Sequence, residues 1–415
     1  MTGIRGPLSD LRILDLTHVW AGPLAVRMLS DLGAQVVKVE APYGRGPQVY
    51  PSEPLGGWLG GEPGEEPWNN NALFVKLHRN RRSLCVDLKH ETGKALLLEL
   101  VAEADVIVEN YSATTMQRMG LGYDELKKAN QQIVYVTMPG FGASGPYSDR
   151  VAFGPVVEPM SGLTTMLGYS SEEPRNSAMA LMDPIAATHA VAAIVSALRE
   201  RQRTGHGSFV ELSLHEGGVS YSGPWLLDQQ LGLAPSCLGN RHPNMVPHGI
   251  YPCQGDDQWL ALGCEQDDQW HSLLELLGQD GAVGGLQLDW RLAERREHES
   301  QIDTVIAGWT AGLDKSQLAE RLQSMGVPAG PVCTVPEMVQ DPQTRHRGFF
   351  VTYERFDTPM PGNPIHLSDL DSTQWAPCPG LGEHNREVLA DWLGYDAEKI
   401  DELCSADVLL DRPPG

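Results

Sequence analysis

Residues 11–40 read LRILDLTHVWAGPLAVRMLSDLGAQVVKVE, and they contain the strongest pattern of strands and helices in the chain. Leu11 to Leu16 is a short apolar run typical of a buried strand, and Pro23 stands where a helix can begin. Apolar residues between 25 and 32 recur at helical spacing, and Gln35 to Glu40 reads as the next strand. A strand, a helix and a second strand in this order predict two parallel strands joined by a crossover helix.

The same alternation continues along the chain. Further strands are expected at 83–88, 105–110, 132–137 and 208–214, with a helix face from 97 to 104. Valine- and isoleucine-rich strands that alternate with helices predict an α/β fold with a parallel sheet covered on both faces.

The character of the sequence changes near residue 235. A chain of 415 residues is too long for one core, so two domains are expected. The second is predicted to be a smaller α+β unit. Its expected elements are a hairpin at 250–253 and 259–262 and helices near 266–278 and 314–325, and a helical tail near 384–404 follows it.

The net charge is -23, which argues against nucleic acid or an anionic membrane as a partner. No run of about 18 apolar residues occurs, so no membrane span is expected. The seven cysteines include no CxxC pair, and the first ten residues have no apolar signal segment. These features favour a reducing cytoplasmic location. No histidine pair has ligand spacing, so no metal site is predicted.

Asp183 is the strongest single candidate for a functional residue, because it precedes Pro184 and a long alanine-rich helix. One interpretation is structural: aspartate is favoured as an N-cap, with proline next to it. The other is catalytic: a carboxylate kept ionised by the helix dipole can attack an acyl carbon and become acylated. The two are compatible, since one oxygen could cap while the other reacts.

Two further motifs have open interpretations. Gly140, Gly142 and Gly145 match GxGxxG after a strand, but Pro146 and a loop follow where the dinucleotide fingerprint needs a helix, so a turn bordering the site is favoured. Residues 78–82 (HRNRR) are the densest basic run, either a solvated surface or an anion site to which Lys89 and Arg118 could add contacts.

Several segments in this order resemble the class III CoA-transferase family, which includes the formyl-CoA and carnitine CoA-transferases. They are residues 14–40, NRRSLCVDLK (80–89), ADVIVENYSATTMQRMGLGYDEL (104–126), GFGASGPYSDR (140–150), RTGHGSFVELSLHE (203–216), GNRHPNMVPHGIYP (239–252) and GVPAGPV (326–332). The resemblance implies an interlocked homodimer. It also implies a large Rossmann-like CoA-binding domain (1–225 and 335–415), a small α+β domain (240–330) and linkers at 226–239 and 331–334.

The resemblance also implies roles for residues. Asp183 matches the family's nucleophile. The residues that match its CoA contacts are Val19, Trp20, Ala21, Val86, Lys89, Asn110, Tyr111 and Arg118. Ala41 and Trp20 replace an arginine and a glutamine used by one family member, so Arg45, Arg81 or Arg82 could compensate at the phosphates. Phe153, Gly140, Gly142 and His242 are candidates for the acyl pocket or the oxyanion loop.

The activity implied is transfer of CoA from an acyl-CoA to a carboxylic acid through an aspartyl anhydride and an aspartyl-CoA thioester. CoA would be a substrate, with no tightly bound cofactor. The alternative that the resemblance implies within the superfamily is an α-methylacyl-CoA racemase. The case for racemase activity is weaker, because Phe153 stands where the racemases have their histidine base. A CoA-binding subunit without activity and a nicotinamide-dependent oxidoreductase are the remaining alternatives.

Overall fold

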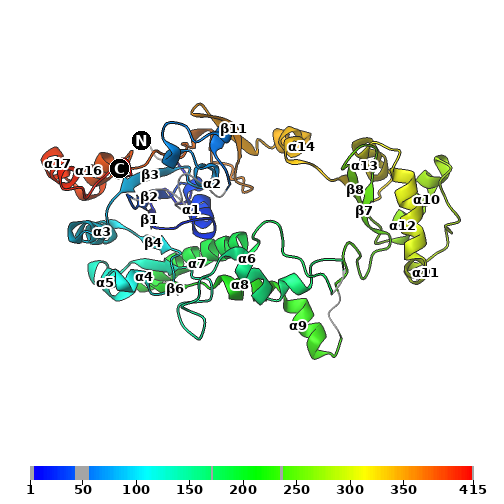
Figure 1. Cartoon of the computed structure of the whole chain (residues 1–415), viewed down its shortest axis with the longest axis horizontal. Coiled ribbons are helices and arrows are strands. Elements are labelled where there is room, and N and C mark those ends of the chain that lie inside the picture. Colours follow the sequence, from blue (N-terminus) through cyan, green and yellow to red (C-terminus); the bar gives the residue numbers. More distant parts are fainter. Residues whose placement is uncertain (1–3, 43–55, 170–171, 234–236, 414–415) are drawn as a thin grey trace. The chain divides into compact units, whose positions relative to one another are not determined.

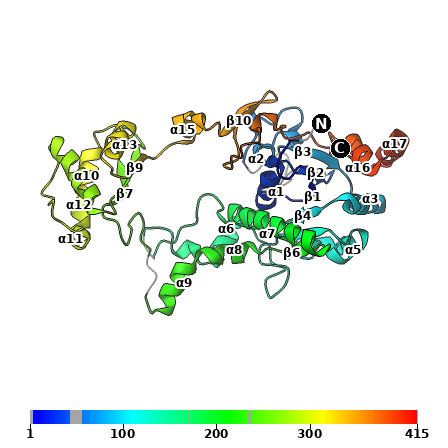
Figure 2. The ribbon, with the colours of Figure 1, turned by 180° about the vertical axis from the view of Figure 1, so that it is seen from behind.

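The computed structural model describes residues 4–42, 56–169, 172–233 and 237–413, drawn in Figures 1 and 2. The chain divides into two compact units. The large unit comprises Met1–Thr164, Asn176–Leu233 and His346–Gly415, and the small unit comprises Thr165–Arg175 and Ala234–Arg345. In the described part of the chain, no helix is both long and apolar enough to cross a membrane.

A parallel sheet in the order β3-β2-β1-β4-β5-β6 forms the centre of the large unit, which confirms the predicted α/β fold. Its strands are β1 (Arg12–Asp15), β2 (Gln35–Glu40), β3 (Arg81–Cys85), β4 (Val106–Glu109), β5 (Val134–Thr137) and β6 (Phe209–Glu211). The order reverses between β1 and β4. Open α/β sheets bind their ligands at such a reversal, beyond the carboxyl ends of the strands.

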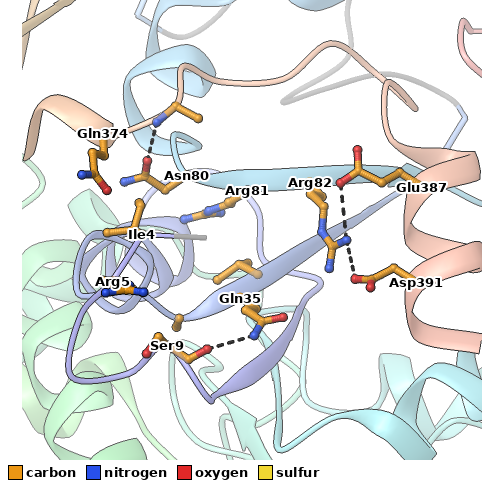
Figure 3. A pocket seen from close by; sticks show the side chains of 14 residues that line it. Ile4, Arg5, Ser9, Gln35, Asn80, Arg81, Arg82, Gln374, Glu387 and Asp391 are labelled. Atoms are coloured by element: carbon orange, nitrogen blue, oxygen red, sulfur yellow. Dashed lines mark hydrogen bonds and ion pairs between the residues drawn. The ribbon is translucent and has the colours of Figure 1, made fainter. Parts of the chain in front are cut away.

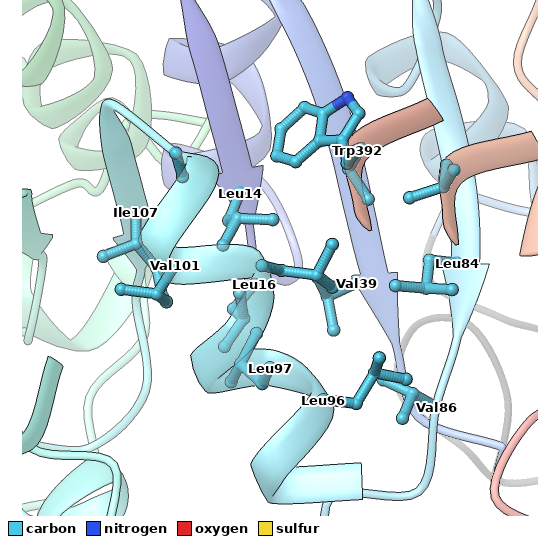
Figure 4. Packing of buried hydrophobic residues seen from close by; sticks show 14 of the residues in the cluster. Leu14, Leu16, Val39, Leu84, Val86, Leu96, Leu97, Val101, Ile107 and Trp392 are labelled. Atoms are coloured by element: carbon cyan, nitrogen blue, oxygen red, sulfur yellow. The ribbon is translucent and has the colours of Figure 1, made fainter. Parts of the chain in front are cut away.

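Helices cover both faces of this sheet (Figure 1). On one face α3 (Glu91–Glu103), α5 (Tyr123–Ala129), α16 (Asn385–Leu393) and α17 (Ala397–Ser405) enclose a core of aliphatic side chains with Trp392, drawn in Figure 4. On the other face α1 (Ala21–Asp31) packs against α7 (Met182–Thr204). The C-terminal helices therefore complete a core that begins near the N-terminus.

The remaining elements of the large unit surround these layers. They are α2 (Ala72–Leu77), α4 (Thr115–Arg118), α6 (Gly154–Met160), α8 (Leu214–Tyr221), α9 (Gly223–Gln230), β10 (Phe350–Tyr353) and β11 (Phe356–Pro361). The strand expected at 208–214 ends early at Glu211, because Ser213 caps α8 by accepting the Glu216 N–H. A polar cap here outweighed the apolar run that predicted a longer strand.

The small unit contains the predicted hairpin and both predicted helices. Strands β7 (His248–Pro252) and β8 (Trp259–Gly263) pair antiparallel, and β9 (Ala329–Pro331) extends the sheet. Its helices are α10 (Asp267–Gln279), α11 (Leu292–Glu297), α12 (Glu299–Thr310) and α13 (Lys315–Ser324), and α14 (Val335–Gln340) and α15 (Pro342–His346) follow. Trp270 and neighbouring leucines fill its core.

The basic run at 78–82 is largely structural. Arg79 forms a bidentate pair with buried Asp31 through contacts of 2.7 and 2.6 Å. Arg81 is buried against Asp15 and also donates to two backbone carbonyls. Arg82 pairs with Asp391 at 2.8 Å (Figure 3). Arg81 and Arg82 begin β3, at the opposite end from its carboxyl edge, so the expectation that either holds CoA phosphates there is wrong. Arg45 lies outside the described residues.

Candidate active site

Loops that follow β1 and β4 meet where the strand order reverses. Asn110 accepts the His18 N–H at 2.7 Å and donates to the His18 carbonyl at 2.8 Å. The hydroxyl of Tyr111 lies 3.1 Å from Nε2 of His18. Burial, with a smaller contribution from Lys38, lowers the pKa of His18 to about 3, so this imidazole is neutral. The structure thus brings Asn110 and Tyr111 against the loop that carries Val19, Trp20 and Ala21.

Buried charges fix the position of that loop. The Lys38 ammonium donates to the carbonyl of Thr17 at 2.7 Å and to that of Asp15 at 3.2 Å. Asp15, which pairs with Arg81, accepts the backbone N–H and the hydroxyl of Thr17. Removing the Asp15 carboxylate would leave the buried charges of Lys38 and Arg81 uncompensated, so these charges hold the turn in place. Val19 has a positive φ of 64° in the same turn.

Asp183 lies in the first turn of α7 and only 8% of it is exposed. The N-cap position of α7 is Leu181, so the interpretation of Asp183 as an N-cap is wrong. Its Oδ1 instead accepts the backbone N–H of Ala21, the first residue of α1, at 3.2 Å. The carboxylate therefore bridges the N-terminal ends of two helices on one face of the sheet.

Gly154, the first residue of α6, packs against the other carboxylate oxygen. A Cβ added at Gly154 would lie 2.2 Å from Oδ2 of Asp183 and 3.0 Å from the Cβ of Ala180. Three helices thus begin around one carboxylate, each with backbone N–H groups that no carbonyl within its own helix accepts. Phe153, just before Gly154, is 57% exposed.

Burial dominates the electrostatics of this carboxylate. It raises the pKa of Asp183 to about 6, against the opposing hydrogen bond from Ala21. The expectation that the helix dipole simply keeps the group ionised therefore needs correction, because desolvation outweighs it. At neutral pH the ionised form still predominates, and it is less well solvated than an exposed carboxylate. A poorly solvated anion is suited to nucleophilic attack.

A buried carboxylate also holds the segment before α7. Glu158 on α6 is fully buried and accepts both the N–H and the hydroxyl of Ser177, each at 2.6 Å. The Ser177 hydroxyl oxygen accepts the Leu181 N–H at 3.3 Å, and Ala180 has a positive φ of 45°. Sequence reasoning missed Glu158 and Gly154. The one available signal was a single charge in the otherwise uncharged segment 152–162.

The sequence predicts a loop, and not a helix, after the glycines at 140–145, and the structure has a loop there. Gly140 packs so closely on Ala152 that a Cβ would lie 2.1 Å from the Ala152 Cβ. Gly142 has a φ of 91°. The neighbouring N–H of Ala143 already donates to the Glu211 carboxylate at 2.6 Å. The Glu211 carboxylate of β6, bound to this loop, opposes binding of a second anion, and the close contact with Ala152 gives Gly140 a structural role.

The other expected contact residues are dispersed. Lys89 is exposed just beyond β3, and Val86 is buried in the core with its N–H on the carbonyl of Glu40. Arg118 is exposed on α4 and donates to the Thr115 hydroxyl. His242 belongs to the small unit, where its Nδ1 accepts the Asn244 N–H at 3.1 Å. Within the described ranges, no cluster of three His, Cys, Asp or Glu side chains could hold a metal ion.

The raised pKa of Asp183 implies that the stability of the folded protein depends on pH. Folding favours protonated Asp183, so this stabilisation is complete below the unfolded pKa near 3.8 and is lost as the pH rises through about 6. Asp183→Asn removes the charge but keeps an oxygen that can accept from Ala21. The variant should be more stable than the parent by about 3 kcal/mol at pH 7, and thermal unfolding between about pH 4 and pH 7 should show the difference fading as the pH falls.

Asp149→Asn is the matched control, because it removes the same charge from an exposed loop. It should change the unfolding midpoint little at any pH. An Asp183→Asn variant no more stable than Asp149→Asn at neutral pH would show that burial does not destabilise the ionised Asp183 carboxylate.

Known proteins match this chain over nearly its whole length. Its residues 8–385 fit the family model described as CoA-transferase family III. The succinyl-CoA–D-citramalate CoA-transferase of Chloroflexus aurantiacus is 32% identical, covering 97% of this chain and 98% of that protein. The succinate–glutarate CoA-transferase of Agrobacterium fabrum is also 32% identical, over 94% of this chain and 97% of its own length.

Solved structures agree with the sequence matches. A CAIB/BAIF family protein from Brucella suis superposes with a TM-score of 0.81 at 31% identity, covering 93% of this chain and 99% of that one. A parallel sheet with its strand-order reversal, a carboxylate at converging helix starts and these matches lead to one conclusion. The chain belongs to CoA-transferase family III.

Proposed function

We propose that this protein transfers CoA from an acyl-CoA donor to a small carboxylic acid, with Asp183 as the covalent nucleophile. The proposal rests on the position of the Asp183 carboxylate. One of its oxygens accepts the Ala21 N–H at the start of α1, and the other lies against Gly154, where a side chain would collide with it. Family membership supports CoA as the group transferred, and relatives named for citramalate, glutarate and oxalate support small acids as partners.

The reaction would proceed through two anhydrides. An Asp183 oxygen attacks the donor thioester carbonyl, and CoA leaves as its thiolate, giving a mixed anhydride. The thiolate attacks the Asp183 carbonyl carbon and forms aspartyl-CoA, and the donor acid departs with one oxygen from Asp183. The acceptor carboxylate attacks aspartyl-CoA and expels the thiolate. The thiolate then takes the acceptor's acyl group and restores the Asp183 carboxylate, so atoms and charge balance.

We assign supporting roles to other residues. Negative charge develops on the former carbonyl oxygens of the tetrahedral intermediates, and backbone N–H groups at the converging helix starts near Asp183 would stabilise it. Asn110 and Tyr111 would contact the pantetheine arm, with Lys89 and Arg118 near the phosphates. A tethered thiolate reacts at high effective concentration, which lets both thiolate steps outpace hydrolysis. CoA acts here as a substrate, and the proposed chemistry needs no further cofactor.

The racemase alternative has less support from this site. A racemase needs a base to remove the α-proton, and Phe153 offers none. Incorporation of solvent deuterium at the α-carbon of an acyl-CoA, without an acceptor acid, would favour that alternative over transfer.

We also propose that the chain forms an interlocked homodimer. Apolar side chains on α6, α8 and α9 are at least 40% exposed in the single chain, namely Val156, Met160, Tyr221, Leu226 and Leu227. A surface of this kind marks an interface more often than a free face.

Light scattering should give twice the mass of one chain, stable on dilution, because interlocked chains separate slowly. Leu227→Glu should shift the protein toward monomer or aggregate. A parent protein that is monomeric at low concentration would contradict the proposed dimer.

Gly154→Ala tests the catalytic site directly. Incubation with an acyl-CoA and trapping by hydroxylamine or borohydride should modify Asp183 in the parent protein. The added methyl group would meet Oδ2 at 2.2 Å and displace the carboxylate, so Gly154→Ala should lose at least about a hundredfold in turnover. Its thermal stability should fall only slightly, because a side-chain end can move.

Gly308→Ala on α12 is the control, since a Cβ there has no atom within 4 Å. It should keep parent-like turnover and trapping. Modification at another residue, or an active Asp183→Ala variant, would overturn the mechanism. Robust turnover by the purified chain alone would exclude a CoA-binding subunit without activity, and binding of a nicotinamide cofactor would favour the oxidoreductase alternative.

A further inference from the structure

Lys76 on α2 has an unusual environment for a lysine. Its ammonium lies 5.4 Å from the centroid of the Trp20 ring, and the residue is half-buried. Among the residues that the structure describes, none forms a hydrogen bond or an ion pair with this ammonium. A partly desolvated cation whose only described contact is a ring face is costly to keep, unless it serves a ligand.

The surroundings of Lys76 carry excess positive charge. The Arg27 guanidinium donates to the Lys76 carbonyl at 3.3 Å. Burial and the nearby Arg27 lower the pKa of Lys76, and no carboxylate of the described residues offsets them. Asp31, the acid of this region, is already engaged by Arg79 through both oxygens. In a chain of net charge -23, this is a local site that attracts anions.

Lys76 lies on the reacting side of the sheet. Trp20 directly precedes Ala21, whose N–H holds the Asp183 carboxylate, and α2 packs on α1. Lys89 and Arg118, the proposed phosphate contacts, instead precede α3 and α5 on the opposite face. An anion bound by Lys76 therefore fits the acyl group and not the nucleotide.

We propose that Lys76 binds the second carboxylate of a dicarboxylic acid whose first carboxyl group reacts at Asp183. The Trp20 ring forms an apolar wall for the methylene chain between the two carboxylates. The inference rests on the proposed function and deepens it, because it makes this a transferase for short dicarboxylic acids. Lys76 is then a specificity-determining residue.

The test compares acids of equal length that differ only in the second carboxylate: succinate with butyrate, and glutarate with valerate. In Lys76→Met, the ratio of kcat/KM for the diacid to kcat/KM for the monoacid should fall roughly 10- to 100-fold, the range of a charge-assisted hydrogen bond. Lys76→Arg should restore part of the ratio. Lys399→Met is the control, since that ammonium also lies over a ring, 3.3 Å from the Tyr395 centroid, and its ratio should stay at the parent value.

A binding measurement separates this inference from the proposed function. Isothermal titration of the parent protein with glutarate and with valerate, without any acyl-CoA, should show a preference for glutarate that Lys76→Met loses. Equal or undetectable binding of both acids by the parent protein would overturn the inference, even if transfer is active. A Lys76→Met variant that raises the KM for acyl-CoA alone would also overturn it, because Lys76 would then serve a phosphate. Absence of turnover with every acid, with the glutarate preference intact, would refute the proposed function instead.

Discussion

The hydrogen bond from the Ala21 N–H to the Asp183 carboxylate is the interaction on which the proposed site depends. It joins residues 162 positions apart and fixes the start of α1 against the start of α7. Each end is held from behind: Lys38 and Asp15 fix the loop before Ala21, and Glu158 fixes the segment before Leu181 through Ser177. These three buried charges therefore help to position the Asp183 carboxylate.

This arrangement exchanges stability for reactivity. A carboxylate with a pKa near 6 is held in an environment that disfavours its charge, and the single hydrogen bond from Ala21 offsets only part of that cost. The positive φ of Ala180 and Val19 adds backbone strain on both sides of the contact. Strain concentrated around one side chain is characteristic of functional sites, where the surrounding fold must compensate.

The sequence predicted what depends on local pattern. The strand–helix–strand unit at 11–40, the parallel sheet, the hairpin at 250–262 and the start of a long helix near Asp183 all follow from periodicity and from the placement of proline and glycine. It failed where the outcome depends on distant partners. The arginines at 79 and 81 look like an anion site until Asp31 and Asp15 are seen beside them, and Gly154 looks ordinary until Asp183 lies against it. The sequence could not single out Lys76, because what distinguishes this lysine is that none of the described residues offers it a carboxylate partner.

If Asp183 is the covalent nucleophile, it gives one oxygen to the donor acid and takes one oxygen from the acceptor acid in every turnover, and an isotope label can follow this exchange. An acceptor acid labelled with a heavy oxygen isotope in its carboxylate is turned over with an unlabelled acyl-CoA, and the peptide containing Asp183 is analysed by mass spectrometry. One heavy oxygen should enter Asp183 in the first turnover, because the restored carboxylate keeps an oxygen of the acceptor. Formation of labelled acyl-CoA with no heavy oxygen in Asp183 would contradict it.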